Sequence, residues 1–157
     1  VWQYNNLMFV VAGYTGAQLA GTTYEDLVLQ RVFRPLGMTA STMAVRETQK
    51  RPDFALPHVL RDGQVREVPF YDYQEFGIGA NGAVNSNVED MLRYLQFHLA
   101  GNEQVLPRTQ FDELHRPVIA TGQGTATYAL GWTVDTRTGQ HRIAHGGAIT
   151  GFTAHAM

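Results

Sequence analysis

Near its C-terminus the chain contains Arg142-Ile-Ala-His-Gly-Gly-Ala-Ile-Thr-Gly-Phe152, in which strand-like residues lead into a run of small ones. A polar turn at 136–139 separates this stretch from an earlier strand-like segment that includes Tyr128-Ala-Leu-Gly-Trp132. Residues 152–157 alternate again in the manner of a strand. The pattern predicts antiparallel strands at 128–135, 140–145 and 152–157.

Helical patterns come earlier in the chain. Asn6 is expected to cap a helix that ends before Gly21, although Gly13 weakens its interior. A capping-box pattern at 22–26 predicts the start of a second helix, which ends near Pro35. This part of the chain therefore reads as a pair of helices.

A hairpin and two more helices are expected farther along. Asp62-Gly63 favours a tight turn inside a long excursion at 39–80. A second capping box, at 86–89, begins a helix that ends at Gly101, and a short helix follows at 108–115. The apolar stripe of the first of these two helices is formed by Val88, Met91, Leu92, Leu95 and Leu99.

The helices come first along the chain and a meander of strands comes last. This order predicts an α+β fold rather than alternating βαβ units. The 157 residues have the size of a single domain. We expect one partial domain at 1–157, with a mainly helical and loop portion at 1–127 and antiparallel strands at 128–157. The chain alternates like a strand up to its last residue and begins on what reads as a functional loop, so we interpret it as an internal fragment.

Composition excludes several classes of function. The net charge is −2, and arginine supplies eleven of the twelve basic residues without clustering, so nucleic acid and anionic membrane surfaces are not expected partners. No apolar run reaches the roughly 18 residues of a membrane span. The absence of cysteine excludes disulfides, thiolate metal sites and a cysteine nucleophile. The six histidines show no metal-ligand spacing, so we expect no metal.

Two short motifs carry chemistry, and each also has a purely structural interpretation. Tyr4-Asn5-Asn6 could be an aromatic residue beside a helix cap. His145 beside Gly146 and Gly147 could be an ordinary strand residue next to two glycines. Their combination with the rest of the chain favours a functional interpretation.

Five segments in order resemble the serine hydrolases related to class C β-lactamases and penicillin-binding proteins. They are Trp2-Gln-Tyr-Asn-Asn-Leu7, Arg34-Pro-Leu-Gly-Met38, the glycine-rich 79–91, Tyr128-Ala-Leu-Gly-Trp132 and His145-Gly-Gly147. The resemblance implies an enzyme of the β-lactamase/transpeptidase-like fold. Such an enzyme cleaves an ester or amide, in a small molecule or peptide, through an acyl-serine intermediate and without a metal or organic cofactor. A periplasmic or secreted location is also what the resemblance favours.

The resemblance also implies roles for individual residues. Tyr4 would belong to the base that activates the serine, and the Asn6 amide would orient the substrate carbonyl or the catalytic lysine. His145 would stand in the place of the lysine of a Lys-Thr-Gly motif. Gly146 and Gly147 would leave room for an extended substrate, and the Ala148 N–H would donate to the oxyanion.

The nucleophile itself is missing from these residues. The family carries it in Ser-x-x-Lys, but the single lysine, Lys50, has Glu47 three residues before it. Ser41 and Ser86 are the only serines, and both are expected to be structural. We therefore expect the nucleophile in a missing N-terminal part of the same protein.

Two other functions stay open. A catalytically silent binding protein of the same fold would hold a peptide or ester without cleaving it. Gly77-Ile-Gly-Ala-Asn-Gly82 matches the glycine spacing of a nicotinamide-dependent oxidoreductase. The oxidoreductase is the more remote of the two, because no buried strand leads into these glycines and the next helix cap comes only at Ser86.

Overall fold

The computed structural model describes residues 1–73, 75, 77–136 and 139–157. Its helices are α1 (Asn6–Ala20), α2 (Tyr24–Val28) with a π-helical continuation (Leu29–Phe33), α3 (Val45–Thr48), a 3₁₀ turn (Gly79–Asn81), α4 (Val88–Ala100) and α5 (Arg108–Leu114). Its strands are β1 (His58–Arg61), β2 (Gln64–Glu67), β3 (Ile119–Ala120), β4 (Thr127–Tyr128), β5 (Thr133–Asp135), β6 (Arg142–Ile149) and β7 (Phe152–Ala156). The predicted α+β class is confirmed.

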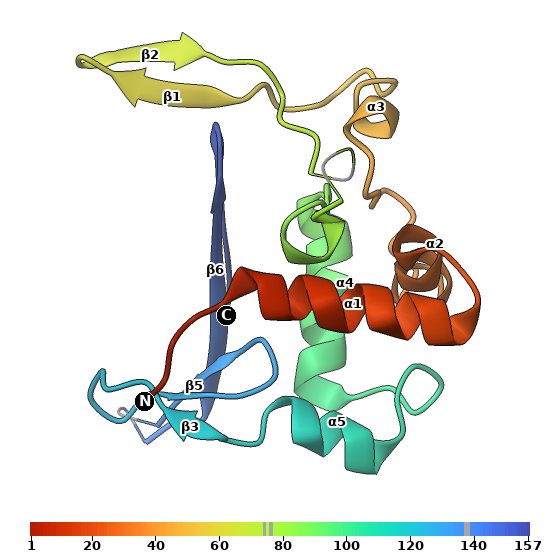
Figure 1. The fold of residues 1–157 in the computed structure, drawn as a ribbon, viewed down its shortest axis with the longest axis vertical. Coiled ribbons are helices and arrows are strands. Elements are labelled where there is room, and N and C mark those ends of the chain that lie inside the picture. Colours follow the sequence, from red (N-terminus) through yellow and green to blue (C-terminus); the bar gives the residue numbers. More distant parts are fainter. Residues whose placement is uncertain (74, 76, 137–138) are drawn as a thin grey trace.

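The sheet leaves one edge of β6 open. Its five strands run antiparallel in the order β3-β4-β5-β6-β7, with α5 at the same end of the molecule as β3 and β5 (Figure 1). β5 pairs with β6 only as far as Ala144, whereas β7 pairs with β6 from His145 to Ile149. Among the described strands, none pairs with the other edge of β6 beyond Ala144. This open edge carries the His-Gly-Gly sequence.

The predicted strand at 128–135 is wrong as a single element. Gly131 adopts a left-handed backbone conformation (φ 83°), and the Ala129 N–H donates to the Trp132 carbonyl at 2.8 Å. The chain therefore turns back, and the two halves pair with each other as β4 and β5. The strand expected at 140–145 continues through the glycines to Ile149. Of the predicted 136–139 turn, residues 137 and 138 lie outside the described residues.

The first helix ends as predicted but is capped one residue earlier than expected. Asn5, not Asn6, has the extended backbone of an N-cap, and its side chain accepts from the Met8 N–H at 3.1 Å. Asn6 is the first helical residue. Gly13 has a packing function, since a Cβ there would lie 2.7 Å from the Tyr24 ring. The missing side chain lets α2 approach α1.

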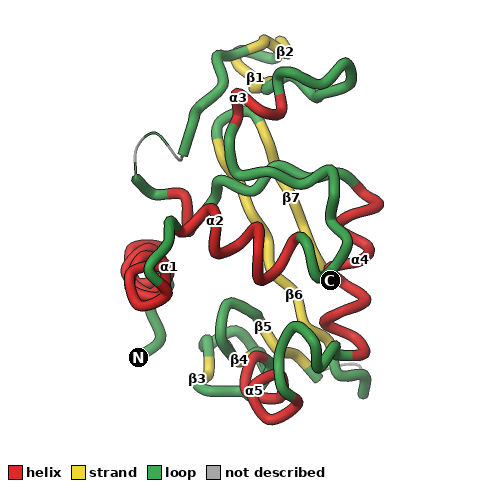
Figure 2. Tube along the Cα trace, turned by 90° about the vertical axis from the view of Figure 1, so that its right-hand side faces the viewer, coloured by secondary structure: helices red, strands yellow, loops and turns green. Residues whose placement is uncertain are grey.

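The hairpin prediction is confirmed. Asp62 and Gly63 both have positive φ, 52° and 73°, which is the requirement of a type I′ turn. The hairpin lies at the opposite end of the molecule from β3 and α5 (Figures 1 and 2). Its base contacts the turn between β6 and β7, where the His58 N–H donates to the Gly151 carbonyl at 3.2 Å.

Helix α4 buries a different face from the one expected. Val88, Leu92 and Leu99 are 75%, 55% and 83% exposed, so the predicted apolar stripe is largely wrong. The buried residues are Asp90, Phe97 and His98. The cap is Asn87 rather than Ser86, because the Asn87 side chain accepts from the Asp90 N–H at 2.9 Å. Polar contacts of Asp90 and an aromatic cluster set the orientation of this helix.

Asp90 is the most buried charged residue and holds the loop after α2 against α4. Its Oδ2 accepts from the Ala40 N–H and the Ser41 hydroxyl, both at 2.8 Å, and its Oδ1 accepts from Arg93 at 2.9 Å. The Ser86 and Ser41 hydroxyls lie 2.8 Å apart. The Ser41 hydroxyl is therefore buried and bound to Asp90, and the exposed Ser86 hydroxyl is held at hydrogen-bond distance from it.

An aromatic cluster packs between α4, α5 and the residues next to them. Its rings are those of Tyr94, Phe97, His98, Phe111, His115 and Trp132. His98 Nδ1 and His115 Nε2 lie 2.8 Å apart, so one proton is shared between α4 and α5. Burial, and after it the neighbouring His115, lowers the pKa of His98 from 6.5 to about 4.

The lowered pKa of His98 predicts that the folded protein loses stability in mild acid. The unfolded chain binds a proton at His98 near pH 6.5, whereas the folded chain does so only near pH 4. His98 therefore does not lower the free energy of unfolding above pH 6.5. As the pH falls towards 4, that free energy drops by up to about 3 kcal/mol. Urea unfolding between pH 7 and pH 4 measures it. His98→Phe should flatten the profile, and His58→Gln, at an exposed histidine, should not. Parallel profiles for parent and His98→Phe would contradict this assignment.

Candidate active site

Tyr4 and His145 meet across 141 residues of sequence. Tyr4 stands just before the cap of α1, and His145 lies on β6 where the partner strand β5 has ended. The Tyr4 hydroxyl oxygen is 3.4 Å from His145 Nε2, at the long end of hydrogen-bond range. The two motifs that the sequence singled out therefore lie next to each other in the folded chain.

An open cleft of about 330 Å³ surrounds this pair. Its lining residues are Trp2, Tyr4, Tyr128, Thr133, Ala144, His145, Gly146 and His155. The volume is within the range of small-molecule sites. The lining residues come from the segment before α1 and from β4, β5, β6 and β7.

Three aromatic rings form one wall of the cleft. The ring centroids of Trp2 and Tyr128 are 5.6 Å apart, and the Tyr4 ring stands edge-on to Tyr128 at 6.1 Å. The Tyr128 hydroxyl is buried and has no hydrogen-bond partner among the described residues. Burial, with a smaller effect of Tyr4, raises the pKa of Tyr128 to about 12, so this side chain remains neutral.

His145 is arranged to stay neutral at pH 7. Burial lowers its pKa, a backbone hydrogen bond at Gly146 partly opposes this, and nearby His155 lowers it further. A neutral imidazole can accept a proton from a hydroxyl or donate one to it. Beside Tyr4, it can act as a proton relay.

The structure gathers only some of the predicted site residues. Gly146 lines the cleft with Tyr4 and His145, while Gly147 and Ala148 continue along β6 and are exposed. Asn6 is exposed and is not among the lining residues.

Sequence reasoning assigned no site role to Trp2, Tyr128 or His155. His155 is the cross-strand neighbour of Gly146, and its ring carbon Cδ2 would lie 3.7 Å from a Cβ at that glycine. The position of His155 depends on the register of β6 with β7, which the sequence pattern does not reveal. Once the turn at Gly151 is fixed, the register pairs these two residues.

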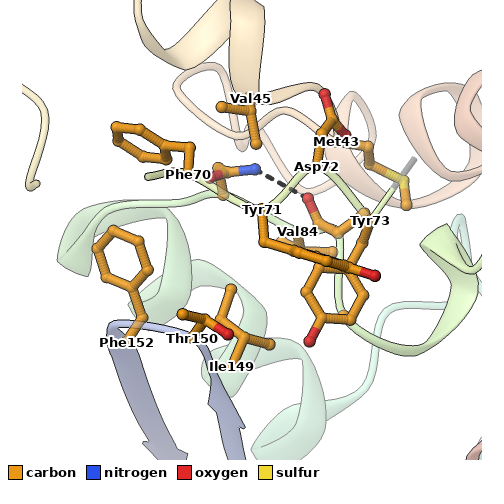
Figure 3. Close-up of a pocket in the computed structure, with 13 residues that line it drawn as sticks. Met43, Val45, Phe70, Tyr71, Asp72, Tyr73, Val84, Ile149, Thr150 and Phe152 are labelled. Carbon is orange, nitrogen blue, oxygen red and sulfur yellow. Dashed lines mark hydrogen bonds between the residues drawn. The ribbon is translucent and has the colours of Figure 1, made fainter. Parts of the chain in front are cut away.

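A second, smaller cavity lies between the long excursion and the β6–β7 turn (Figure 3). Its walls include Phe70 and Phe152 on one side and Tyr71 and Tyr73 on the other, with Ile149 at the end of β6. Its volume of about 20 Å³ suits a single water molecule rather than a substrate. The Tyr4–His145 cleft is therefore the better candidate site.

Comparison with known proteins identifies the family. The Beta-lactamase family model matches residues 1–157. The chain belongs to the beta-lactamase family. This confirms the resemblance that the five sequence segments indicated.

The beta-lactamase-family relatives include hydrolases. Over 163 residues the chain is 26% identical to the unguisins hydrolase ungD′ of Aspergillus campestris, covering 96% of this chain and 29% of that protein. A beta-lactamase-like protein 2 of Dictyostelium discoideum is 27% identical, over 80% of this chain and 22% of its own length. The chain thus spans less than a third of these curated relatives.

Solved structures confirm the fold. The octameric penicillin-binding protein homologue from Pyrococcus abyssi superposes with a TM-score of 0.91 at 24% identity, over 99% of this chain and 35% of that one. A D-stereospecific amidohydrolase from Streptomyces superposes with a TM-score of 0.79 at 26% identity, over 96% of this chain and 44% of that one. The predicted β-lactamase/transpeptidase-like fold is therefore confirmed.

The described residues contain no group of three or more His, Cys, Asp or Glu side chains placed to hold a metal ion. Within the same residues, no helix combines the length and apolar character needed to cross a membrane. Catalysis without a cofactor stays a prediction.

Proposed function

We propose that the protein is a serine hydrolase that cleaves an ester or amide through an acyl-serine intermediate. The observation that carries the proposal is the contact of Tyr4 with His145 in a cleft beside the open edge of β6. Family membership and the hydrolases among the relatives support it. The nucleophilic serine is contributed by a segment outside residues 1–157.

The proposed reaction has two halves. In the first, the Tyr4 hydroxyl passes its proton to His145 and takes that of the serine, whose oxygen attacks the substrate carbonyl. The bond to the leaving alcohol or amine then breaks, and Tyr4 gives this group a proton while recovering its own from His145. In the second, water attacks the acyl-serine and gives a proton to Tyr4 in the same way, the bond to the serine oxygen breaks, and Tyr4 returns the proton to the serine. His145, 3.4 Å from the Tyr4 hydroxyl, holds and relays the proton between these steps.

The strand supplies the groups that bind the substrate. Gly146 and Gly147 keep the exposed part of β6 bare, so an extended acyl group can lie along its open edge. We assign the Ala148 N–H as a donor to the carbonyl oxygen, where negative charge develops in the transition state. Asn6, in the first turn of α1, is proposed to orient the substrate or the catalytic lysine once the remaining segment is in place.

Covalent labelling tests the proposed function. The full-length protein is incubated with a fluorophosphonate, weighed, and digested to locate the adduct. We expect one adduct on a serine outside residues 1–157, and the same adduct in a Ser41→Ala, Ser86→Ala double variant. An adduct on either of these serines would reverse their assignment as structural. Failure of a folded protein to react, with ester binding retained, would instead favour the catalytically silent binding protein.

A further inference from the structure

The cleft around Tyr4 carries no formal charge in the part that these residues build. Its lining side chains are aromatic rings, two imidazoles, a threonine, an alanine and a glycine. The four ion pairs among the described residues all involve positions outside this lining: Lys50–Glu47, Arg93–Asp90, Arg108–Asp112 and Arg116–Glu113. No Asp, Glu, Lys or Arg side chain of this lining would offset the hydration that a substrate carboxylate or ammonium loses here.

The imidazole beside Tyr4, that of His145, does not supply the missing charge. His145 is held neutral by burial and by the proximity of His155. At neutral pH the His145 ring therefore offers an anionic substrate a hydrogen bond but no ionic partner.

The opposite wall favours a flat apolar group. Trp2, Tyr4 and Tyr128 lie with their ring centroids 5.6 to 6.4 Å apart, as in aromatic clusters that accept another ring. Because its hydroxyl is buried, Tyr128 presents its ring rather than its polar end to the cleft. The wall is thus an apolar surface next to the proposed reacting atoms.

We propose that the substrates are uncharged esters or amides with an aromatic or similarly flat apolar acyl group, packed against Trp2 and Tyr128. This inference rests on the proposed function and narrows its substrate class. The proposed substrate class includes neutral acyl compounds. It excludes penicillins and peptides with a free C-terminal carboxylate, because both bring an anion into the site.

A matched set of substrates tests this preference in the full-length protein. The set comprises the p-nitrophenyl esters of acetic acid, of phenylacetic acid, and of phenylacetic acid with a para-carboxylate on the acyl ring. We expect kcat/KM to be at least tenfold higher for the neutral phenylacetyl ester than for either of the others, because hydrophobic pockets discriminate by roughly 10- to 200-fold. Equal or better turnover of the carboxylated ester would overturn the inference.

Three variants locate the cause of the preference. Trp2→Ala should lower kcat/KM for the phenylacetyl ester about tenfold, whereas Tyr128→Phe, which keeps the ring, should retain the preference. His155→Lys places an ammonium over Gly146 and should raise kcat/KM for the carboxylated ester about tenfold relative to the neutral one. An unchanged substrate ratio in both Trp2→Ala and His155→Lys would place the selectivity elsewhere and overturn the inference. Hydrolysis of none of the three esters, together with no fluorophosphonate adduct, would overturn the proposed function itself.

Discussion

Tyr4→Phe is expected to lower kcat of the full-length protein by about 10² to 10⁴. Phenylalanine keeps the ring that packs against Trp2 and Tyr128 but removes the oxygen that lies 3.4 Å from His145. Without that oxygen, the serine proton loses the acceptor that the proposed mechanism assigns to it. Steady-state ester hydrolysis measures the effect, and KM should change little because the aromatic wall persists.

Tyr14→Phe is the matched control. Tyr14 lies on α1, packs against Tyr24 with the ring centroids 5.6 Å apart, and does not line the cleft. It should retain kcat within about threefold, since its hydroxyl has no part in the proposed proton transfer. Comparable losses in the two variants would reduce Tyr4 to a packing residue.

Asp90→Ala is expected to give the largest loss of stability in the chain. Asp90 is 1% exposed, and its carboxylate accepts hydrogen bonds from Ala40, Ser41 and Arg93. Removing it leaves the buried Ser41 hydroxyl and the partly buried Ala40 N–H without their acceptor, which costs about 2 to 5 kcal/mol of unfolding free energy. Urea unfolding followed by the fluorescence of buried Trp132 measures the loss.

Asp112→Ala provides the comparison on the surface. Asp112 also pairs with an arginine at 2.9 Å, Arg108, but both side chains are more than half exposed. Solvent screens such a pair, so the variant should lose less than about 1 kcal/mol. Similar losses at positions 90 and 112 would show that burial of the Asp90 network contributes little.

Local patterns were sufficient to predict the class of fold and most of the helices. Gly21 ends α1, the box at 22–26 begins α2, and Asp62-Gly63 makes the hairpin turn, because each depends on neighbouring residues only. The family could also be predicted, since its motifs are short and keep their order along the chain.

Features that depend on distant contacts could not be predicted in this way. The buried face of α4 is set by Asp90, whose partners Ala40 and Ser41 lie about 50 residues away in sequence. His155 enters the cleft through the register of β7 with β6. The same limit applies to Trp2 and Tyr128, whose rings meet only in the folded chain.

The choice between adjacent capping residues also depended on backbone geometry. Asn5 and Asn6 both have a side chain able to cap α1, and Asn87 competes with Ser86 at α4. Composition alone does not distinguish such neighbours, because both are good capping residues. The extended backbone at Asn5 and Asn87 decides which side chain reaches the helix N–H groups.

The central claim is that Tyr4 and His145 act as one catalytic unit, and a double-mutant cycle tests it most directly. The value of kcat/KM is measured for the full-length parent, Tyr4→Phe, His145→Ala and the double variant. If the pair forms one proton relay, the double variant should be little slower than Tyr4→Phe alone, because residues that act together show strongly non-additive losses. Fold-losses that multiply, as for independent residues, would contradict the account.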